Sequence, residues 1–373
     1  MRSTFWNRIK VGSYYRGLLG PEQRSKHIEE IVAFFLDRTC GVPFSFEFWM
    51  RRCNYNIRPI LVDLIVHSEQ WEEVSIELDP SVLVYFCGAK GRLPLLKMLD
   101  IYVTNNDQWN TGNTISSMVA NVFEDAPLLT HAVLWDTPWS QFKFNWSSLT
   151  IVNFQQSLAI PRNILPTLKE TVNLVELIIE RQFPEGLESG LIHLPHLKSL
   201  SVDHVAFLAC LETPSLQRLK IDYDYLSPSN NLHSVGIIGA FLNRSEIKLS
   251  TLVIVHGLAA IVTEILRFTP EIDQLVLLKV PEIADVFKWL GTRTQRCRNL
   301  NVLLCSIFKG DEKGFGALHD MIVHRNPLGD VRNPSPRKVI IQTREGAAAN
   351  VELLCRDREI QFELIKMATY MYM

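Results

Sequence analysis

The stretch LPHLKSLSV, residues 194–202, contains the pattern on which this chain is built. Its apolar residues Leu197, Leu200 and Val202 stand at offsets 0, 3 and 5. The stretch TPSLQRLKI, residues 213–221, repeats those offsets at positions 216, 219 and 221. Side chains alternate between the two faces of a β-strand, so offsets 3 and 5 share one face. Each stretch therefore predicts a short strand with one buried face, and the residue at offset 0 enters the same core from the preceding turn.

The same pattern recurs through the middle of the chain in ten copies, whose spacing varies from 17 to 33 residues. The mean spacing of about 25 residues lies in the 20–29 residue range of leucine-rich repeats. One such strand cannot bury its face alone, so the copies are expected to stack side by side. The first residues of the ten copies are Trp71, Leu96, Leu129, Trp146, Leu174, Leu197, Leu216, Leu249, Ile272 and Leu300.

The segments between the copies carry helix signals. Residues 57–66 (IRPILVDLIV), 115–123, 162–170, 257–268 and 311–324 favour helices. Prolines such as Pro94, Pro195 and Pro270 come just before strands, where they end a helix and begin an extended segment. Leucine abundance alone does not explain that placement. We therefore predict an irregular leucine-rich-repeat-like right-handed α/β solenoid, with a parallel sheet on its concave face.

The ends of the chain depart from the repeat. Residues 1–56 are expected to form an N-terminal cap, 57–308 the solenoid, and 309–373 a C-terminal α/β cap, because terminal units must cover the exposed end of the core. In the first cap a helix at 28–36 leads to a strand at 43–48. Past residue 308 the rhythm is expected to stop, with a strand at 337–342 and a closing helix at 349–367. The Asn that normally supports the turn at offset 8 is missing from the clearest copies, which predicts irregular turns.

Composition excludes several classes of protein. Hydrophobic residues make up 47% of the chain and charged residues 21%, which indicates a folded chain. The net charge of −2 gives no electrostatic reason to expect binding to nucleic acid or to an anionic membrane. Seven irregularly spaced cysteines do not predict a disulfide scaffold. The chain shows no signal peptide or transmembrane segment, and we expect it in the cytoplasm, the nucleus or both.

Residues that could carry chemistry are few and scattered. His193 and His196 form an H-x-x-H pair in a turn, without a third ligand nearby in the sequence. Asp222 follows a strand, with a second carboxylate two residues later. No phosphate loop or nucleophile elbow is present. We predict no catalytic residue, no cofactor and no metal, and we keep an enzyme using His193, His196 or Asp222 as the least favoured alternative.

The residue at offset 4 points away from the core, toward the concave face. Five of the ten are aliphatic, and either strand propensity or an apolar binding partner explains that share. Ser75, Asp100 and Thr150 occupy this position in three copies. The other seven form the face on which we predict partner binding: Val133, Ile178, Ser201, Lys220, Val253, Val276 and Leu304.

Two tryptophans are further candidates for an interface. Trp135 and Trp139 flank a turn in WDTPW, whereas Trp146 falls on a core position of the repeat. Large amphipathic aromatic side chains often anchor protein interfaces. The alternative is a loop that folds over one edge of the solenoid and buries both rings.

Three segments resemble a known family. They are FFLDRTCGVPFSFEF (34–48), LVDLIVHSEQWEEVSIEL (61–78) and GRLPLLKMLDI (91–101). They are similar to segments of the fungal, mostly basidiomycete, F-box proteins with degenerate leucine-rich repeats. The resemblance covers roughly residues 30–105. The matching positions are Arg38, Gly41, Pro43, Ser45, His67, Ser68, Trp71, Val74, Ser75, Gly91, Leu93, Pro94, Leu95, Leu96, Leu99 and Ile101.

The resemblance implies a non-enzymatic role as the substrate-recruiting part of an SCF-type ubiquitin ligase, with an unidentified protein as substrate. In that family an F-box docks on a Skp-type adaptor. Residues 3–11 (STFWNRIKV) look like the stretch that follows an F-box, so the F-box itself is expected to be missing from this chain. The adaptor is a partner only if an F-box exists upstream. The alternative is a box-less repeat scaffold with no link to ubiquitination.

Overall fold

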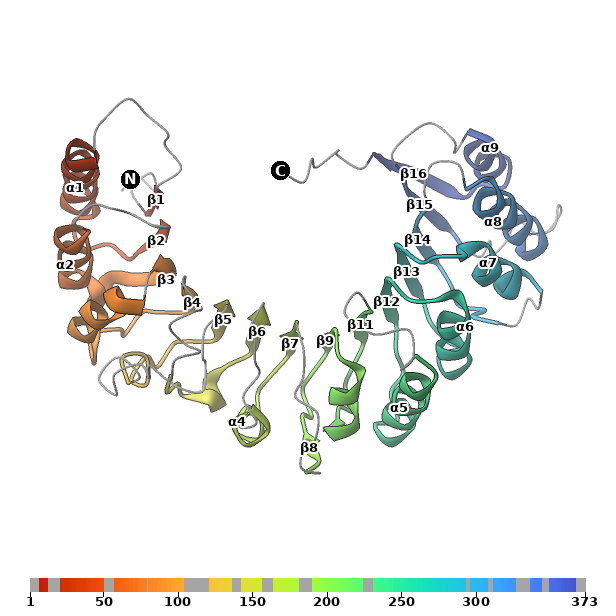
Figure 1. Ribbon diagram of the computed structural model, residues 1–373, viewed down its shortest axis with the longest axis horizontal. Coiled ribbons are helices and arrows are strands. Elements are labelled where there is room, and N and C mark those ends of the chain that lie inside the picture. The colour runs from red at the N-terminus through yellow and green to blue at the C-terminus, as the bar shows by residue number, and fades with distance from the viewer. Residues whose placement is uncertain are drawn as a thin grey trace. The chain divides into compact units, whose positions relative to one another are not determined.

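The computed structural model describes residues 7–12, 21–49, 57–78, 80–103, 121–135, 142–155, 164–180, 190–223, 231–292, 296–307, 311–326, 336–343 and 349–366. These residues form two compact units, Met1–Glu188 and Ser189–Met373. In each unit the strands form one layer, and the helices lie on one side of it (Figure 1). The helix predicted at 115–123 lies almost wholly outside the described residues.

The N-terminal unit contains seven described strands in one parallel sheet, and their order in space is their order in the sequence. The described α-helices of this unit are α1 (Pro21–Thr39), α2 (Arg58–Val66) and α4 (Ile164–Glu170). Short 3₁₀ helices at Ser68–Gln70, Pro80–Ala89 and Trp146–Ser148 occupy other connections. The strands are β1 (Arg8–Gly12), β2 (Phe44–Trp49), β3 (Trp71–Leu78), β4 (Met98–Val103), β5 (His131–Trp135), β6 (Ile151–Gln155) and β7 (Glu176–Ile179).

The C-terminal unit has the same organisation with longer helices. A two-stranded pair, β8 (Ile192–His193) and β10 (Leu211–Glu212), lies apart from its main sheet, and a 3₁₀ helix spans Val205–Cys210. The helices are α5 (Asn231–Arg244), α6 (Ala259–Phe268), α7 (Ile283–Gly291), α8 (Glu312–Arg325) and α9 (Ala349–Asp357). The parallel strands are β9 (Ser199–Val202), β11 (Arg218–Asp222), β12 (Thr251–Val255), β13 (Gln274–Leu278), β14 (Val302–Ser306), β15 (Lys338–Thr343) and β16 (Gln361–Lys366).

The repeat pattern explains this register. Leu200 pairs with Leu219, which pairs with Leu252, so residues at offset 3 form a ladder across the strands. Offset 5 forms a second ladder beside it, which includes Ile221 and Ile254. All these side chains lie buried beneath the sheet. Burial of one such side chain is worth about 1.5–3 kcal/mol, and a slip of one residue would turn the whole row outward. The predicted α/β solenoid with a parallel sheet is confirmed.

Arginines bind backbone carbonyls that lie between the strands of the C-terminal unit. In the C-terminal unit, Arg244 of α5 donates to the carbonyl of Leu211 at 2.7 Å. Arg325 of α8 donates to the carbonyl of Cys297, also at 2.7 Å. Arg358, just after α9, donates to the carbonyl of Asn326 at 3.0 Å. Guanidinium groups from one repeat thus satisfy backbone carbonyls of the repeat before it, which helix ends and turns leave without partners.

The structure corrects the register of one copy. Val152 and Phe154 of β6 pair with Ala132 and Leu134 of β5, so this copy begins at Leu149 rather than Trp146. The neighbouring copies then lie 20 residues before it and 25 residues after it. Thr150 is accordingly outside offset 4, which Asn153 occupies. Trp146 is an attractive first residue on apolar character alone, but strand pairing places it in the preceding 3₁₀ helix.

The repeat also continues past residue 308, contrary to the prediction. Val339 of β15 pairs with Leu303 of β14, and Phe362 of β16 pairs with Val339. The closing helix predicted at 349–367 is wrong beyond α9, because the chain turns at Glu359, whose φ is 56°, and enters β16. Pairing with β15 satisfies backbone groups that a longer helix would leave open at the sheet edge. The division at residues 56 and 308 stays a prediction.

Candidate functional site

Each sheet has one face turned away from the buried ladders. Its side chains come from offsets 2, 4 and 6 of each repeat, and the labelled helices lie on the other side of the sheet (Figure 1). We call this surface the open face. Parallel strands in register align equivalent residues into rows across the sheet, so the open face presents ordered rows of side chains. Within the N-terminal unit these rows carry charged and aromatic groups.

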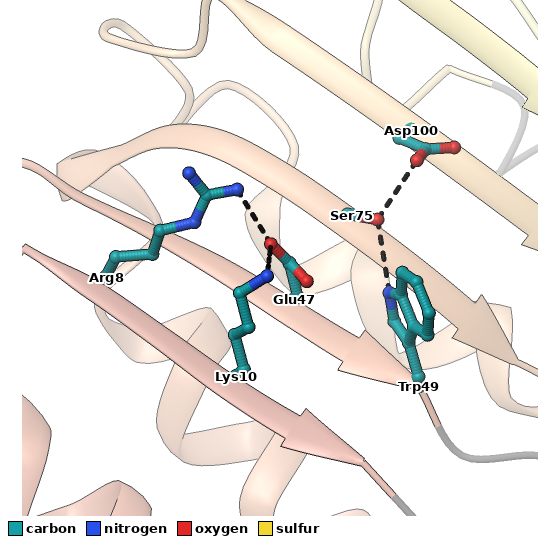
Figure 2. Close-up of polar contacts among 6 residues, drawn as sticks. All are labelled: Arg8, Lys10, Glu47, Trp49, Ser75 and Asp100. Carbon is teal, nitrogen blue, oxygen red and sulfur yellow. Dashed lines mark hydrogen bonds and ion pairs between the residues drawn. The ribbon is translucent and has the colours of Figure 1, made fainter. Parts of the chain in front are cut away.

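A shared ion pair lies on β1 and β2. The Nη2 atom of Arg8 and the Nζ atom of Lys10 each lie 2.7 Å from the same carboxylate oxygen of Glu47. Figure 2 shows the two cations converging on that carboxylate. Burial of Glu47 acts to raise its pKa, but the hydrogen bonds and charges of Lys10 and Arg8 outweigh it and lower the pKa. Arg8 and Lys10 therefore neutralise the negative charge of Glu47 at this end of the open face.

A chain of neutral donors leads from β2 to β4. The indole N–H of Trp49 donates to the Ser75 hydroxyl at 3.3 Å, and that hydroxyl donates to Asp100 at 3.1 Å (Figure 2). The indole of Trp135, on β5, also donates to the Asp100 carboxylate. Four strands thus contribute one side chain each to a network centred on Asp100.

Asp100 titrates far from its ordinary range. Burial raises its pKa from an ordinary value of 3.8 to about 6. The hydrogen bonds from Ser75 and Trp135 lower the pKa, whereas the negative charges of Glu47 and Glu77 raise it further. Ionisation of Asp100 therefore destabilises the folded chain. Carboxyl groups with pKa values shifted in this way concentrate at functional sites.

Aromatic rings lie in the row at offset 6, next to the offset 4 row that contains Asp100. Trp49 pairs with Glu77, Glu77 with Tyr102, and Tyr102 with Trp135 across the four strands. The Tyr102 and Trp135 ring centroids are 6.4 Å apart. Trp49 is 38% exposed, whereas Glu77 is only 4% exposed. Such a row of rings and carboxylates, held in register by the sheet, can recognise a ligand but contains no nucleophile–base pair.

The predicted partner-binding residues all lie on the open face, on strands of the two units. Val133 and Ile178 of the N-terminal unit are half-buried. In the C-terminal unit Lys220, Val276 and Leu304 are half-buried as well.

Two of the predicted residues present little surface, because Val253 is only 4% exposed and Ser201 is also buried. Val276 and Leu304 are nevertheless adjacent across β13 and β14. They form an apolar row on this open face. The role of all seven residues as a binding face stays a prediction.

Trp135 is half-buried on the open face, and Trp139 lies outside the described residues. Sequence reasoning missed Trp49 and Tyr102, since only offset 4 was counted as pointing outward. Offset 6 lies on the same face as offset 4 by the strand period of two. If offset 6 had been included as well as offset 4, Trp49, Tyr102 and Trp135 would have fallen in one predicted row.

The candidate chemical residues remain dispersed. The Nδ1 atom of His193 lies 3.4 Å from a carboxylate oxygen of the half-buried Glu212, and His193 and His196 are both exposed. The Nδ1 atom of His256 lies 2.9 Å from a carboxylate oxygen of Asp222. In the part of the chain that the structure describes, no three His, Cys, Asp or Glu side chains are grouped as a metal site would require. The six described cysteines are free thiols.

Asp100→Asn is expected to stabilise the protein at neutral pH. A carboxyl group with a higher pKa in the folded state than in the unfolded state takes up a proton on folding. Its stabilising contribution is complete below about pH 4 and is lost as the pH rises through about 6. Asparagine removes the charge and keeps an acceptor, so the free energy of unfolding should rise by about 1–3 kcal/mol at neutral pH.

Urea denaturation of both proteins at neutral pH and near pH 4 measures this effect. The stability difference should shrink at the lower pH, where Asp100 is protonated in the folded state and about half protonated in the unfolded state. Asp37→Asn, at an exposed position on α1, serves as the control and should change little. A less stable Asp100→Asn protein at neutral pH would show that the charge stabilises the fold, contrary to this account.

Two solved structures are similar to this chain at low sequence identity. The chain is similar to the leucine-rich repeat-containing protein LegL7 from Legionella pneumophila, with 12% identity and a TM-score of 0.42, over 85% of this chain and 98% of that one. It is also similar to a Bacteroides fragilis protein, with 11% identity and a TM-score of 0.36, over 82% and 68% of the respective chains. Because these identities and TM-scores are low, the fold assignment rests on the strand pairing within this chain.

The sequence matches no family model and no curated protein. Among the described helices, none has the length and hydropathy needed to cross a bilayer.

Proposed function

We propose that this chain is a protein-recognition solenoid that binds its partner through the open face and does no chemistry itself. The observation that supports the proposal is the ordered open face, on which strand register aligns exposed and half-buried side chains from successive repeats. Such a surface is rigid before binding, so little conformational freedom is lost on association. Extended faces of this kind are the usual binding surfaces of solenoid proteins.

We further propose a role in ubiquitination on the basis of the resemblance over residues 30–105. The chain would then recruit a substrate protein to an SCF-type ligase, and an F-box encoded upstream would bind the Skp-type adaptor. The alternative, a box-less scaffold, differs from this proposal in the adaptor alone. Both share the open face as the place where the partner binds.

Affinity purification of the tagged chain from its native cells tests the ligase role. The chain is expressed as given and also with its reading frame extended upstream, and the partners are identified by mass spectrometry. The adaptor and a cullin are expected only with the extended chain. Their absence from both would contradict the ligase role and favour the scaffold.

Photo-crosslinking tests the binding face independently of the ligase. A photoreactive residue at Val276, on the open face of β13, is compared with one at Lys288, exposed on α7 of the same unit. A partner recovered in the affinity purification, with or without the adaptor, should crosslink at position 276 and not at 288. Crosslinking only at 288 would place the partner on the helical side and overturn the open-face proposal.

A further inference from the structure

The open face of the N-terminal unit holds three aromatic rings next to two carboxylates. Trp49, Tyr102 and Trp135 come from β2, β4 and β5, and Glu77 and Asp100 come from β3 and β4. We call these five residues the aromatic–acidic patch. The patch spans four adjacent strands, which at about 4.8 Å per strand places roughly 14 Å between β2 and β5. That width is enough for a short peptide segment to cross.

Neutral side chains donate hydrogen bonds to the Asp100 carboxylate. Burial raises its pKa to about 6, the hydrogen bonds from the Ser75 hydroxyl and the Trp135 indole only partly oppose that rise, and the charges of Glu47 and Glu77 add to it. Glu47 already has the cations of Arg8 and Lys10 at 2.7 Å. Asp100 and Glu77 therefore create a negative potential beside the rings, and a cation from outside would relieve the cost of burying the Asp100 charge.

The rings favour the same kind of ligand. A cation is attracted to the face of a tryptophan or tyrosine ring, and the planar guanidinium of arginine also stacks on such rings. Trp49 is 38% exposed, and Tyr102 and Trp135 are half-buried next to each other. The indole N–H groups of Trp49 and Trp135 are held by the Ser75–Asp100 network, which fixes the rings before a ligand arrives.

We propose that the aromatic–acidic patch binds a basic segment of the partner protein, with an arginine side chain stacked against the rings and its charge facing Asp100. This inference rests on the proposed function, because it specifies the chemistry of the segment that the open face recognises. Alternate side chains of an extended peptide point to the same side. A segment with arginine at every second position therefore presents its cations to the patch together.

The test uses the full chain and the peptide GRGRGRG-amide, labelled with fluorescein at its N-terminus. The control peptide replaces each arginine with citrulline, which has nearly the same shape and no charge. Fluorescence anisotropy is measured up to about 1 mM peptide, the weak end of specific binding. The arginine peptide should bind, and the citrulline peptide should bind at least about tenfold more weakly, as expected for the loss of a charged hydrogen bond.

Substitutions locate the binding site. Asp100→Asn and Trp49→Leu should each weaken binding of the arginine peptide by about tenfold or more. Asp222→Asn removes a carboxylate from the open face of the C-terminal unit and should leave binding unchanged. Circular dichroism and thermal unfolding confirm that each variant is folded. Trp49 is partly exposed, so its replacement should be tolerated.

Three results would overturn the inference. They are equal affinity for both peptides, no binding of either peptide to the folded protein, and unchanged affinity after both Asp100→Asn and Trp49→Leu. If the peptide results are negative while the partner still crosslinks at position 276, the basic segment is wrong and the proposed function stands. If crosslinking at 276 is also absent, the open face is not the recognition surface, and both fail.

Discussion

Leu200→Asp is expected to unfold the C-terminal unit. Leu200 lies at offset 3 of β9, is 0% exposed, and pairs with Leu219 in the buried ladder. An aspartate there removes a core side chain and places a carboxylate in apolar surroundings. The two effects together should cost about 5 kcal/mol or more, which is comparable to the whole stability of an ordinary domain. Because successive repeats share this ladder, the damage should spread beyond β9.

Circular dichroism, chemical denaturation and limited proteolysis measure the loss. Lys198→Asp is the matched control, since it introduces the same residue two positions earlier, where the side chain is exposed. That control should unfold like the wild-type protein. A soluble Leu200→Asp protein with a wild-type unfolding transition would contradict the stacked core.

Arg325→Met is expected to destabilise the C-terminal unit by about 3–5 kcal/mol, because each buried carbonyl left without its donor costs about 1–3 kcal/mol. Arg325 is 8% exposed, and burial lowers its pKa. Its guanidinium donates to the carbonyls of Leu290 at 3.3 Å, Arg296 at 2.7 Å and Cys297 at 2.7 Å. Methionine retains much of the apolar volume but leaves those buried carbonyls without their donor, and each unmet group is costly.

Urea denaturation compares this variant with Arg356→Met, which removes an exposed arginine from α9. The control should stay within about 0.5 kcal/mol of the wild-type protein. Arg325→Lys retains the charge and loses the forked geometry, so its stability should fall between the two. A stability loss for Arg325→Met no larger than that of the control would show that the arginine does not support the turn.

Much of the fold follows from local pattern. The offsets 0, 3 and 5 predict where strands such as β9 and β11 occur and which of their side chains are buried, because strand periodicity is a property of a few adjacent residues. The same local reasoning fails at Trp146 and after α9. There, pairing with β5 and with β15 decided the outcome against local apolar character.

The candidate site was less accessible to such reasoning. Asp100 and Ser75 could be placed on the outward face, and Trp135 was noted for its aromatic character. Their connection could not be seen, because Ser75 and Asp100 are 25 residues apart in the chain and meet only through strand register. The raised pKa of Asp100 likewise depends on burial and on charges from neighbouring strands.

The sequence alone therefore determined the repeat, the parallel α/β solenoid and the identity of most core residues, since each depends on side-chain alternation within one short segment. Only the tertiary structure decided which outward side chains become neighbours, which of them stay exposed, and which carboxylate is held by indole and hydroxyl donors. The physical reason is that adjacency on a sheet is set by pairing between strands that are distant in sequence, and desolvation exists only once the strands are assembled.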